Sequence, residues 1–387
     1  MVDLKKILLS LFILLSINLF AQDKPEVKLG GALRFNYNLS SWKEGQNDRG
    51  GDFGYDVFRI NANAKYKGVK LNAEYRLYST GFGGGMLKQG WVGYDFNAAD
   101  ELQVGLTQVP FGNTQYNSHN WFFSINYYLG LEDDHDMGIK FNHNGSNWEY
   151  SLAFFKNAEE MGFGNYSDVS DSRYSYDVSS IDYDGNETLD LRNKEINQFN
   201  GQLSYKLGND RTNHKIGVSA EYGGLYNLDV QETGSHYALA AHYDLNISRF
   251  NLKAQASYYK YNPKTRVDDL QNVVAMTAYG APYLVASKAT TYTLGAAYSI
   301  PVKWGPVSSL QVYNDFGLMD KVNSNFQNSL MNVTGILVSA GNVYTYIDYA
   351  AGKNQPWLGS VWTDALAAGT IDAKWNTRFN INIGYYF

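Results

Sequence analysis

Four arginines in this sequence share a setting, because each lies on the polar face of a segment in which polar and apolar residues alternate. They are Arg34, Arg59, Arg76 and Arg378. A guanidinium group keeps its charge at any physiological pH and binds carboxylates or phosphates through paired hydrogen bonds. If the four segments lie side by side, the arginines form a basic wall suited to anions.

Lysines on the same polar faces extend this wall, namely Lys28, Lys65, Lys70 and Lys140. Each arginine is roughly seven to nine residues from the same end of its segment, so we expect the four to lie at similar depth. An alternative is that the arginines simply pair with nearby acids such as Glu74.

The segment 110–136 combines large rings with a cluster of acids. Its rings would be costly to expose to water, so we expect the segment to fold against other parts of the chain. An external apolar loop that binds a partner protein is the alternative. The acidic end of the segment 110–136 either faces the arginines across a polar space, or its negative charge is outweighed by theirs. In the second case the polar space favours anions. The residues concerned are Tyr116, Trp121, Phe122, Phe123, Tyr127, Tyr128, Leu129, Glu132, Asp133, Asp134 and Asp136.

Other chemical motifs are weak. Asp182, Asp184, Asn186 and Asp190 are spaced like the first half of a calcium loop, but Glu187 replaces the required glycine and no glutamate closes the set. A solvated loop is the favoured interpretation, so no metal site is predicted. His236 and His242 share one strand face about 20 Å apart, too far to cooperate in catalysis. The chain has no Cys, which excludes thiolate metal sites and Cys nucleophiles. Neither an enzyme nor a cofactor is predicted.

These residues are positioned by segments with a two-residue period, which is typical of strands. Large apolar residues face one side and polar residues the other along most of the chain. The pattern predicts sixteen strands, at 27–39, 55–67, 69–79, 87–96, 101–109, 137–144, 147–156, 195–207, 214–226, 236–246, 249–261, 290–301, 306–319, 332–340, 342–351 and 374–387.

Long polar connections alternate with tight turns, which is the pattern of an outer-membrane barrel. Lipid offers no hydrogen-bond partner, so a sheet in a membrane must close. The last strand must therefore pair with the first. We predict an all-β fold, a transmembrane sixteen-stranded antiparallel β-barrel in which the third long loop, 110–136, folds inward. A terminal aromatic residue, Phe387, is similar to the signal by which such barrels are recognised by the outer-membrane insertion machinery.

The start of the chain predicts export. A short basic lead, an apolar run and a small residue at Ala21 are typical of a signal peptide at 1–21. Residues 22–387 then form one barrel domain with a long external loop at 157–194. The 32 Tyr, 20 Phe and 8 Trp suit the two interfaces of a bilayer, and a net charge of −6 gives no support for nucleic-acid binding.

Two stretches, FGNTQYNSHNWFFSINYYLGLEDDHDMGIKF and GILVSAGNVYTYIDYAAGKNQPWLG, resemble porins of Bacteroidetes related to the phosphate-selective O and P type. The resemblance implies a sixteen-stranded barrel, commonly a homotrimer, that passes small anions by diffusion. It also implies that Arg34, Arg59, Arg76 and Arg378 serve as an arginine ladder.

The resulting hypothesis is a water-filled passive diffusion channel in the outer membrane of a Gram-negative bacterium, with charge selectivity from the basic wall. One alternative is a channel specific for oligosaccharides, with rings such as Trp91 as stacking surfaces. Another is a surface adhesin or structural barrel that acts through the loops 157–194 and 262–289.

Overall fold

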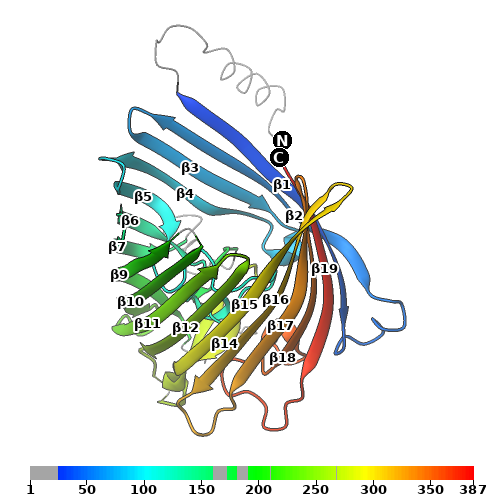
Figure 1. The fold of residues 1–387 in the computed structure, drawn as a ribbon. Helices are drawn as coiled ribbons and strands as arrows, with labels where there is room; N and C mark the ends of the chain where they lie inside the picture. The colour runs from blue at the N-terminus through cyan, green and yellow to red at the C-terminus, as the bar shows by residue number, and fades with distance from the viewer. Residues whose placement is uncertain (1–24, 160–171, 181–190, 210, 267) are drawn as a thin grey trace, which may run out of the picture.

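The computed structural model describes residues 25–159, 172–180, 191–209, 211–266 and 268–387. The predicted signal peptide and the calcium-like residues Asp182 to Asp190 lie outside these ranges. Within them the prediction of an all-β fold is confirmed, because sixteen antiparallel strands close into one barrel (Figure 1). No helix in the described ranges has the length and apolar character needed to cross a membrane.

Every predicted strand is present, with ends that differ by a few residues. In order around the barrel the strands are β1 (Glu26–Ser40), β19 (Asn376–Tyr386), β18 (Val343–Lys353), β17 (Ser329–Ala340), β16 (Val307–Lys321), β15 (Lys288–Trp304), β12 (Phe250–Asn262), β11 (Thr233–Ile247), β10 (Thr212–Asn227), β9 (Asn193–Asn209), β7 (Trp148–Ala158), β6 (His135–Asn144), β5 (Asp100–Gln108), β4 (Gly85–Asp95), β3 (Val69–Leu77) and β2 (Asp52–Tyr66).

The barrel closes between its first and last strands, as predicted. Leu33 lies opposite Tyr385 and Leu39 opposite Phe379 in this antiparallel pair. Beyond the strand end, the backbone of Phe387 exchanges two hydrogen bonds with Gly31, at 2.9 and 3.1 Å. A Cβ atom at Gly31 would lie 2.3 Å from the Arg59 carbonyl oxygen and 2.8 Å from the Phe387 ring. Glycine is therefore required where the terminal ring folds over the seam.

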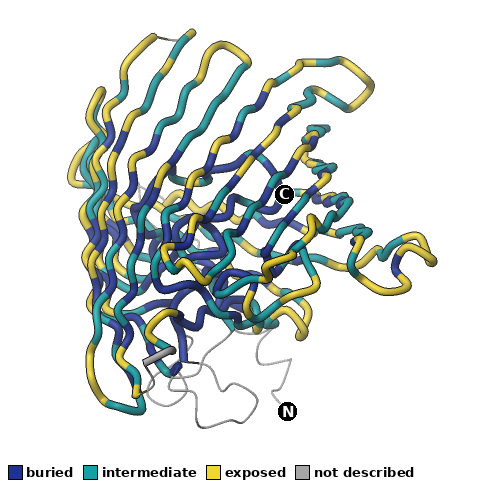
Figure 2. Tube along the Cα trace, turned by 90° about the horizontal axis from the view of Figure 1, so that it is seen from below, coloured by how far each residue is buried: buried dark blue, intermediate teal, exposed yellow. Residues whose placement is uncertain are grey.

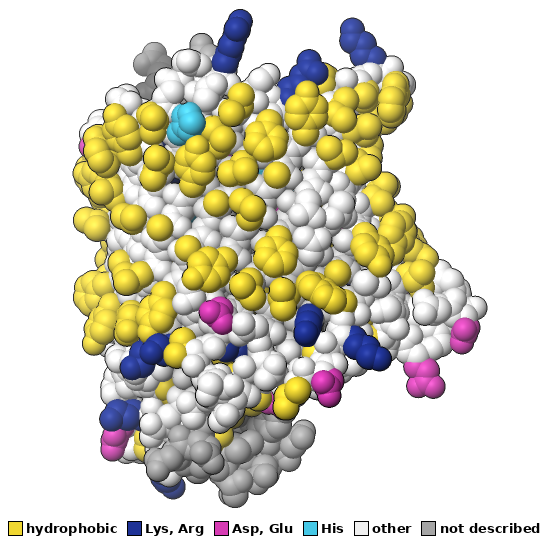
Figure 3. Space-filling view, turned by 60° about the horizontal axis from the view of Figure 1, so that its bottom comes forward, with side chains coloured by type: hydrophobic (Ala, Val, Ile, Leu, Met, Phe, Trp, Pro, Cys, Tyr) yellow, Lys and Arg dark blue, Asp and Glu magenta, His cyan; other side chains and the backbone are white. Residues whose placement is uncertain are grey.

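The outer face of the barrel is an apolar belt. Along β10, Ile216, Val218 and Tyr222 are exposed, whereas the alternating residues Ser219 and Glu221 are buried on the inner face. Figure 3 shows apolar side chains over a broad band, with charged side chains mostly toward its two ends. This distribution is typical of strands that face lipid.

The interior holds a second, smaller sheet that the sequence pattern did not predict. It consists of β8 (Asp177–Val178), β13 (Val273–Thr277) and β14 (Tyr283–Ala286), in the order β14, β13, β8. β8 lies in the predicted external loop 157–194. Residues 173–180 are nevertheless all buried, so this part of the loop packs inside and is not exposed. Its apolar side chains gain more from burial than from contact with water.

The buried core joins this small sheet to the segment 110–136. Ile125, Leu129, Tyr176, Val274 and Tyr283 are all fully buried in one cluster. Figure 2 shows buried stretches of chain gathered toward one end of the barrel, with exposed and intermediate stretches at the other. The connections that the structure describes contain four short 3-10 helices, at η1 (Thr80–Phe82), η2 (Tyr127–Leu129), η3 (Asp268–Asn272) and η4 (Pro356–Leu358).

Candidate functional site

A cavity of about 670 Å³ lies inside the barrel and is lined by all four arginines singled out in the sequence. The same cavity is lined by rings of the segment 110–136 and of residues next to the strands of the interior sheet. The lining rings include Tyr116, Trp121, Phe122, Phe123, Tyr127, Tyr128, Tyr174, Tyr176, Tyr279 and Trp357. The structure therefore brings together the arginines and aromatic residues that were predicted separately.

The expectation that the four arginines lie at similar depth is wrong for Arg378. Arg59 and Arg76 are direct cross-strand partners. Arg59 lies opposite Ala32, two residues before Arg34. Arg378 lies opposite Ser40, which is six residues after Arg34 and hence about 20 Å further along β1. Counting residues from strand ends fails because strands in a barrel are staggered, so the four arginines form a diagonal across the wall.

Acidic partners neutralise this wall only in part. Arg34 lies 2.9 Å from Asp56, whereas Arg59 and Arg76 share Glu74 at 3.5 and 2.6 Å. Across the described ranges no acid lies within ion-pair distance of Arg378, whose guanidinium carbon lies 6.0 Å from the centre of the Phe122 ring.

The cavity lining is consequently basic. Beside the four arginines it includes Lys43, and its acids are Asp52 and Asp56. Glu74 lies behind this lining and neutralises one further charge. Positive charge therefore remains in excess, and much of the cavity surface between the charges is aromatic.

Lys43 and Asp56 line the cavity but were not predicted from the alternation of residue types. The register between β1 and β2 shifts at Arg34 and Phe35, and this bulge allows Asp56 to reach Arg34 although Asp56 does not follow the alternation. Bulges are not visible in a two-residue pattern. Lys43 lies in a connection, where the pattern makes no prediction about direction.

The predicted lysines lie elsewhere. Lys28 is exposed and lies 2.6 Å from Glu26. Lys65 and Lys70 both pair with Asp95, at 2.7 and 3.0 Å. Lys140 is buried and donates a hydrogen bond to the Gln108 carbonyl oxygen at 2.7 Å. None of the four lines the cavity, and the same is true of Trp91.

The start of the segment 110–136 is tethered to the inner faces of strands across the barrel. The Gly112 N–H donates to the Ser219 hydroxyl at 3.0 Å, and the Asn113 N–H donates to Gln255 Oε1 at 2.9 Å. A Cβ at Gly112 would collide with Gln255 at 2.3 Å. Such close approach lets the backbone lie directly on the wall.

Polar side chains continue this attachment through the middle of the segment. The Asn117 amide donates to the Thr293 hydroxyl. His119 Nδ1 lies 2.8 Å from Asp315 Oδ1, and the His119 N–H donates to the other oxygen of Asp315 at 2.8 Å. The contacts to β10, β12, β15 and β16 therefore hold the segment inside the barrel along its length.

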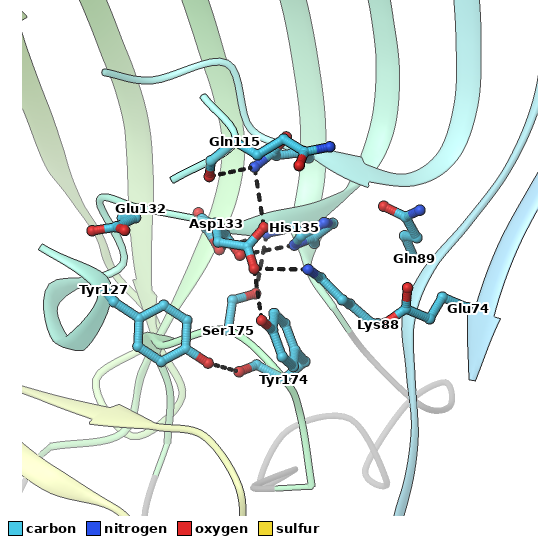
Figure 4. A network of polar contacts seen from close by, with 12 residues as sticks. Glu74, Lys88, Gln89, Gln115, Tyr127, Glu132, Asp133, His135, Tyr174 and Ser175 are labelled. Atoms are coloured by element: carbon cyan, nitrogen blue, oxygen red, sulfur yellow. Dashed lines mark hydrogen bonds and ion pairs between the residues drawn. The ribbon is translucent and has the colours of Figure 1, made fainter. Parts of the chain in front are cut away.

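The acidic end of the segment faces the protein interior and not the cavity. Asp133 accepts hydrogen bonds from Lys88 Nζ at 2.7 Å, the Tyr174 hydroxyl at 2.6 Å and Gln108 at 3.1 Å (Figure 4). The Tyr174 ring also lies 4.4 Å from the Arg76 guanidinium carbon and 4.6 Å from Lys88 Nζ. Tyr174 thus links the arginine diagonal to the acidic end.

Glu132 is likewise occupied within the segment. Its carboxylate accepts the N–H groups of Asn117 and Ser124, at 2.9 and 3.2 Å, and the Ser124 hydroxyl. Burial raises the pKa of Glu132 to about 7, against the opposing effect of these hydrogen bonds. Glu132 therefore stabilises the fold of the segment and does not line the cavity.

The two histidines on β11 do not form a catalytic arrangement with the groups described. His236 and His242 are both buried. His242 Nε2 lies 3.3 Å from the Ser204 hydroxyl, but His242 Nδ1 has no hydrogen-bond partner within the described ranges. A serine hydrolase needs an acidic or amide group at that nitrogen to orient the ring.

No family model matches the chain, and no curated protein matches it. Solved structures do share its fold. An anion-selective porin from Comamonas acidovorans is 15% identical with a TM-score of 0.58, covering 94% of this chain and 100% of that chain. The outer membrane channel DcaP of Acinetobacter baumannii is 10% identical with a TM-score of 0.57, covering 95% and 99%.

Salmonella typhi OmpF, in a complex with daunomycin, is 10% identical with a TM-score of 0.58, also covering 95% and 99%. These likenesses extend over nearly the whole of each chain. At such low identity they establish the architecture, a porin-like sixteen-stranded barrel.

Proposed function

We propose that this protein is an outer-membrane porin, a passive diffusion channel that favours small anions. The observation that carries the proposal is the cavity inside the barrel, whose lining has five basic and two acidic side chains. Fixed positive charge in a narrow polar space attracts anions and repels cations. The apolar outer belt and the fold shared with an anion-selective porin support the same conclusion.

In this proposal the segment 110–136 is the constriction, because its rings and the four arginines line the same cavity. The guanidinium of Arg378 offers a site that no described acid occupies, and the geometry of arginine suits phosphate. Inorganic phosphate is therefore the first anion to test. Assembly as a homotrimer, export by residues 1–21 and insertion through the strand that ends at Phe387 belong to the same proposal.

A second candidate function is passage of oligosaccharides. The observation that favours it is the ring-rich lining of the cavity, which includes Trp121, Tyr128, Tyr346 and Trp357, since sugars stack on aromatic faces. A saturable block of conductance by an oligosaccharide, with no effect of phosphate, would support this alternative. An adhesin that acts through 157–194 and 262–289 has less support, because 173–180 and β13 are buried.

The deciding experiment is the reversal potential of the purified protein in a planar bilayer under a potassium chloride gradient, with and without phosphate. We expect anion preference that falls when phosphate occupies the cavity. Cation preference, or the absence of any stable conductance, would contradict the proposal.

A further inference from the structure

A cluster of buried acids lies inside the barrel, apart from the arginine-lined cavity. Asp134 precedes β6, Asp136 lies on β6, and Asp177 lies on β8 of the interior sheet. One carboxylate oxygen from each lies within 4.8 Å of the others. At most 6% of each residue is exposed, so these acids are not an ordinary solvated surface cluster.

Three further buried acids surround this trio. Glu159 follows β7, Glu195 lies on β9 and Glu221 lies on β10. All three act electrostatically on Asp136. Glu195 accepts the Val178 N–H at 3.0 Å, and Glu159 accepts the N–H and hydroxyl of Ser175. Both contacts are made by residues within two positions of Asp177, so Glu159 and Glu195 approach β8 beside the trio.

The countercharge is insufficient. Arg173 lies 3.2 Å from Asp177 and is the one basic side chain of the described ranges within ion-pair distance of these six acids. Burying a carboxylate without a partner is costly, and the interior sheet would repel the wall if the acids were ionised and unpaired.

A second observation points to a ligand. Asp136 is 1% exposed; among the described residues its Oδ1 has no hydrogen-bond partner, and its Oδ2 accepts only a long contact of 3.4 Å from Gln198. Glu159 Oε2 also lacks a partner in the part of the chain that the structure describes. In the β8–β13 pair, Thr277 lies opposite Asp177. The Thr277 hydroxyl is fully buried and has no hydrogen-bond partner among the described residues. Buried oxygen atoms are rarely left in this state.

We propose that a calcium ion binds between Asp134, Asp136 and Asp177. The neighbouring glutamates either supply further oxygen ligands or contribute negative charge just outside the ligands. Calcium takes six to eight oxygen ligands at about 2.3–2.6 Å, so two ligands of one ion can be about 5 Å apart. Magnesium needs shorter bonds and loses its water reluctantly. The ion ties the interior sheet, through β8, to β6 of the barrel wall.

The test uses the purified, detergent-solubilised full chain, from which a chelator has first removed bound metal. Isothermal titration calorimetry then measures the binding of calcium. We compare the wild type with Asp134→Asn/Asp136→Asn and with Asp182→Asn/Asp184→Asn, because the latter pair belongs to the calcium-like pattern in the sequence. We expect the first variant to bind one calcium fewer per chain than the wild type, and the second to retain that ion.

The proposal is overturned if the wild type binds no calcium, or if the Asp134/Asp136 variant retains all the calcium that the wild type binds. If the wild type binds no calcium, the buried acids are stabilised by shared protons and not by a metal ion. Should the double variant fail to fold, Asp136→Asn alone serves, with calcium affinity expected to fall at least tenfold. Thermal unfolding of the wild type is a further readout, since calcium should raise the midpoint more than equimolar magnesium. Equal shifts from the two ions would contradict the assignment.

Discussion

The basic cavity and the acidic cluster lie in the same barrel interior, but their charged groups differ in sign and in the space around them. Around the cavity, open space lies beside the arginines, and Arg378 is left without an acidic partner in the described ranges. In the cluster, six acids are buried, and Arg173 is the one basic side chain of the described residues within ion-pair distance of them. Charge that faces water can stay unpaired, whereas buried charge requires a proton, a counter-ion or a metal. We therefore infer that the charges beside the cavity act on solutes, whereas the charges of the buried cluster organise the interior.

The contact between Lys88 and Asp133 marks the boundary between these two regions. Lys88 comes from β4, on the side of the arginines, and Asp133 lies directly before the acids of the cluster. Both side chains are almost fully buried. Predictions that break or sharpen the comparison begin with this pair.

Replacing Lys88 by Met should have the largest effect. The substitution keeps the length of the side chain but leaves the Asp133 carboxylate buried with only Tyr174 and Gln108 as side-chain partners. Breaking a buried ion pair from one side costs about 3–5 kcal/mol in the free energy of unfolding. Urea unfolding of the detergent-solubilised protein, followed by tryptophan fluorescence, measures this loss.

Lys206→Met is the matched control. Lys206 pairs with Glu149 at 2.6 Å in a half-exposed setting, where Lys215 also reaches Glu149. The expected cost is about 0–1 kcal/mol. Equal losses in the two variants would remove the distinction between buried and water-facing charge.

Replacing Arg378 by Ala should reduce anion preference without a comparable loss of stability, because no described acid is left unpaired by the change. A unit charge about 6 Å from a permeating ion in water contributes about 0.7 kcal/mol, or about threefold in relative permeability. Reversal potentials measure the change.

Arg211→Ala is the control for charge alone, since Arg211 is exposed in the turn between β9 and β10. An equal fall in anion preference in both variants would argue against selectivity at the cavity.

Replacing Asp56 by Asn should increase the preference for anions. Asp56 neutralises Arg34 at 2.9 Å and accepts a hydrogen bond from Asn382 at 2.8 Å. Asn keeps the size of the side chain and removes its charge, so anion preference should rise by about twofold. A fall in anion preference would show that Asp56 positions Arg34 and does more than neutralise it.

Replacing Lys28 by Ala should have the smallest effect. Lys28 is 73% exposed and pairs only with Glu26 at the barrel rim. Water screens such a pair, so we expect neither the unfolding midpoint nor the reversal potential to change measurably. A clear loss of anion preference would mean that the basic wall extends to the rim.

The alternation of residue types was sufficient to predict the barrel strands. The sixteen predicted ranges correspond to the sixteen barrel strands, and the seam between β1 and β19 was inferred correctly from the C-terminal pattern. The interior sheet was not predicted. β8 has two residues and β14 has four, which is too short for a period to be recognised, and β13 is buried throughout and does not alternate.

The site was predicted as a set of residues and not as an arrangement. Parity on each strand placed the four arginines on inner faces, and they line one cavity. Their diagonal order depends on the stagger of the barrel, which no single strand encodes. The acidic end of 110–136 was expected to face the arginines or to be outweighed by them, yet Asp133 pairs with Lys88 and Asp134 approaches Asp177 from another loop.

Away from bulges such as the one at Asp56, the sequence by itself determined which strand residues face inward and which face outward, because a strand places successive side chains on opposite sides. It also determined closure, because a sheet in lipid cannot leave an edge unpaired. Only the tertiary structure decided which inward charges meet water and which are buried together. That outcome depends on segments far apart in the chain, such as 173–180 and β13, filling one end of the barrel and excluding water from the acids while leaving the arginines beside a cavity.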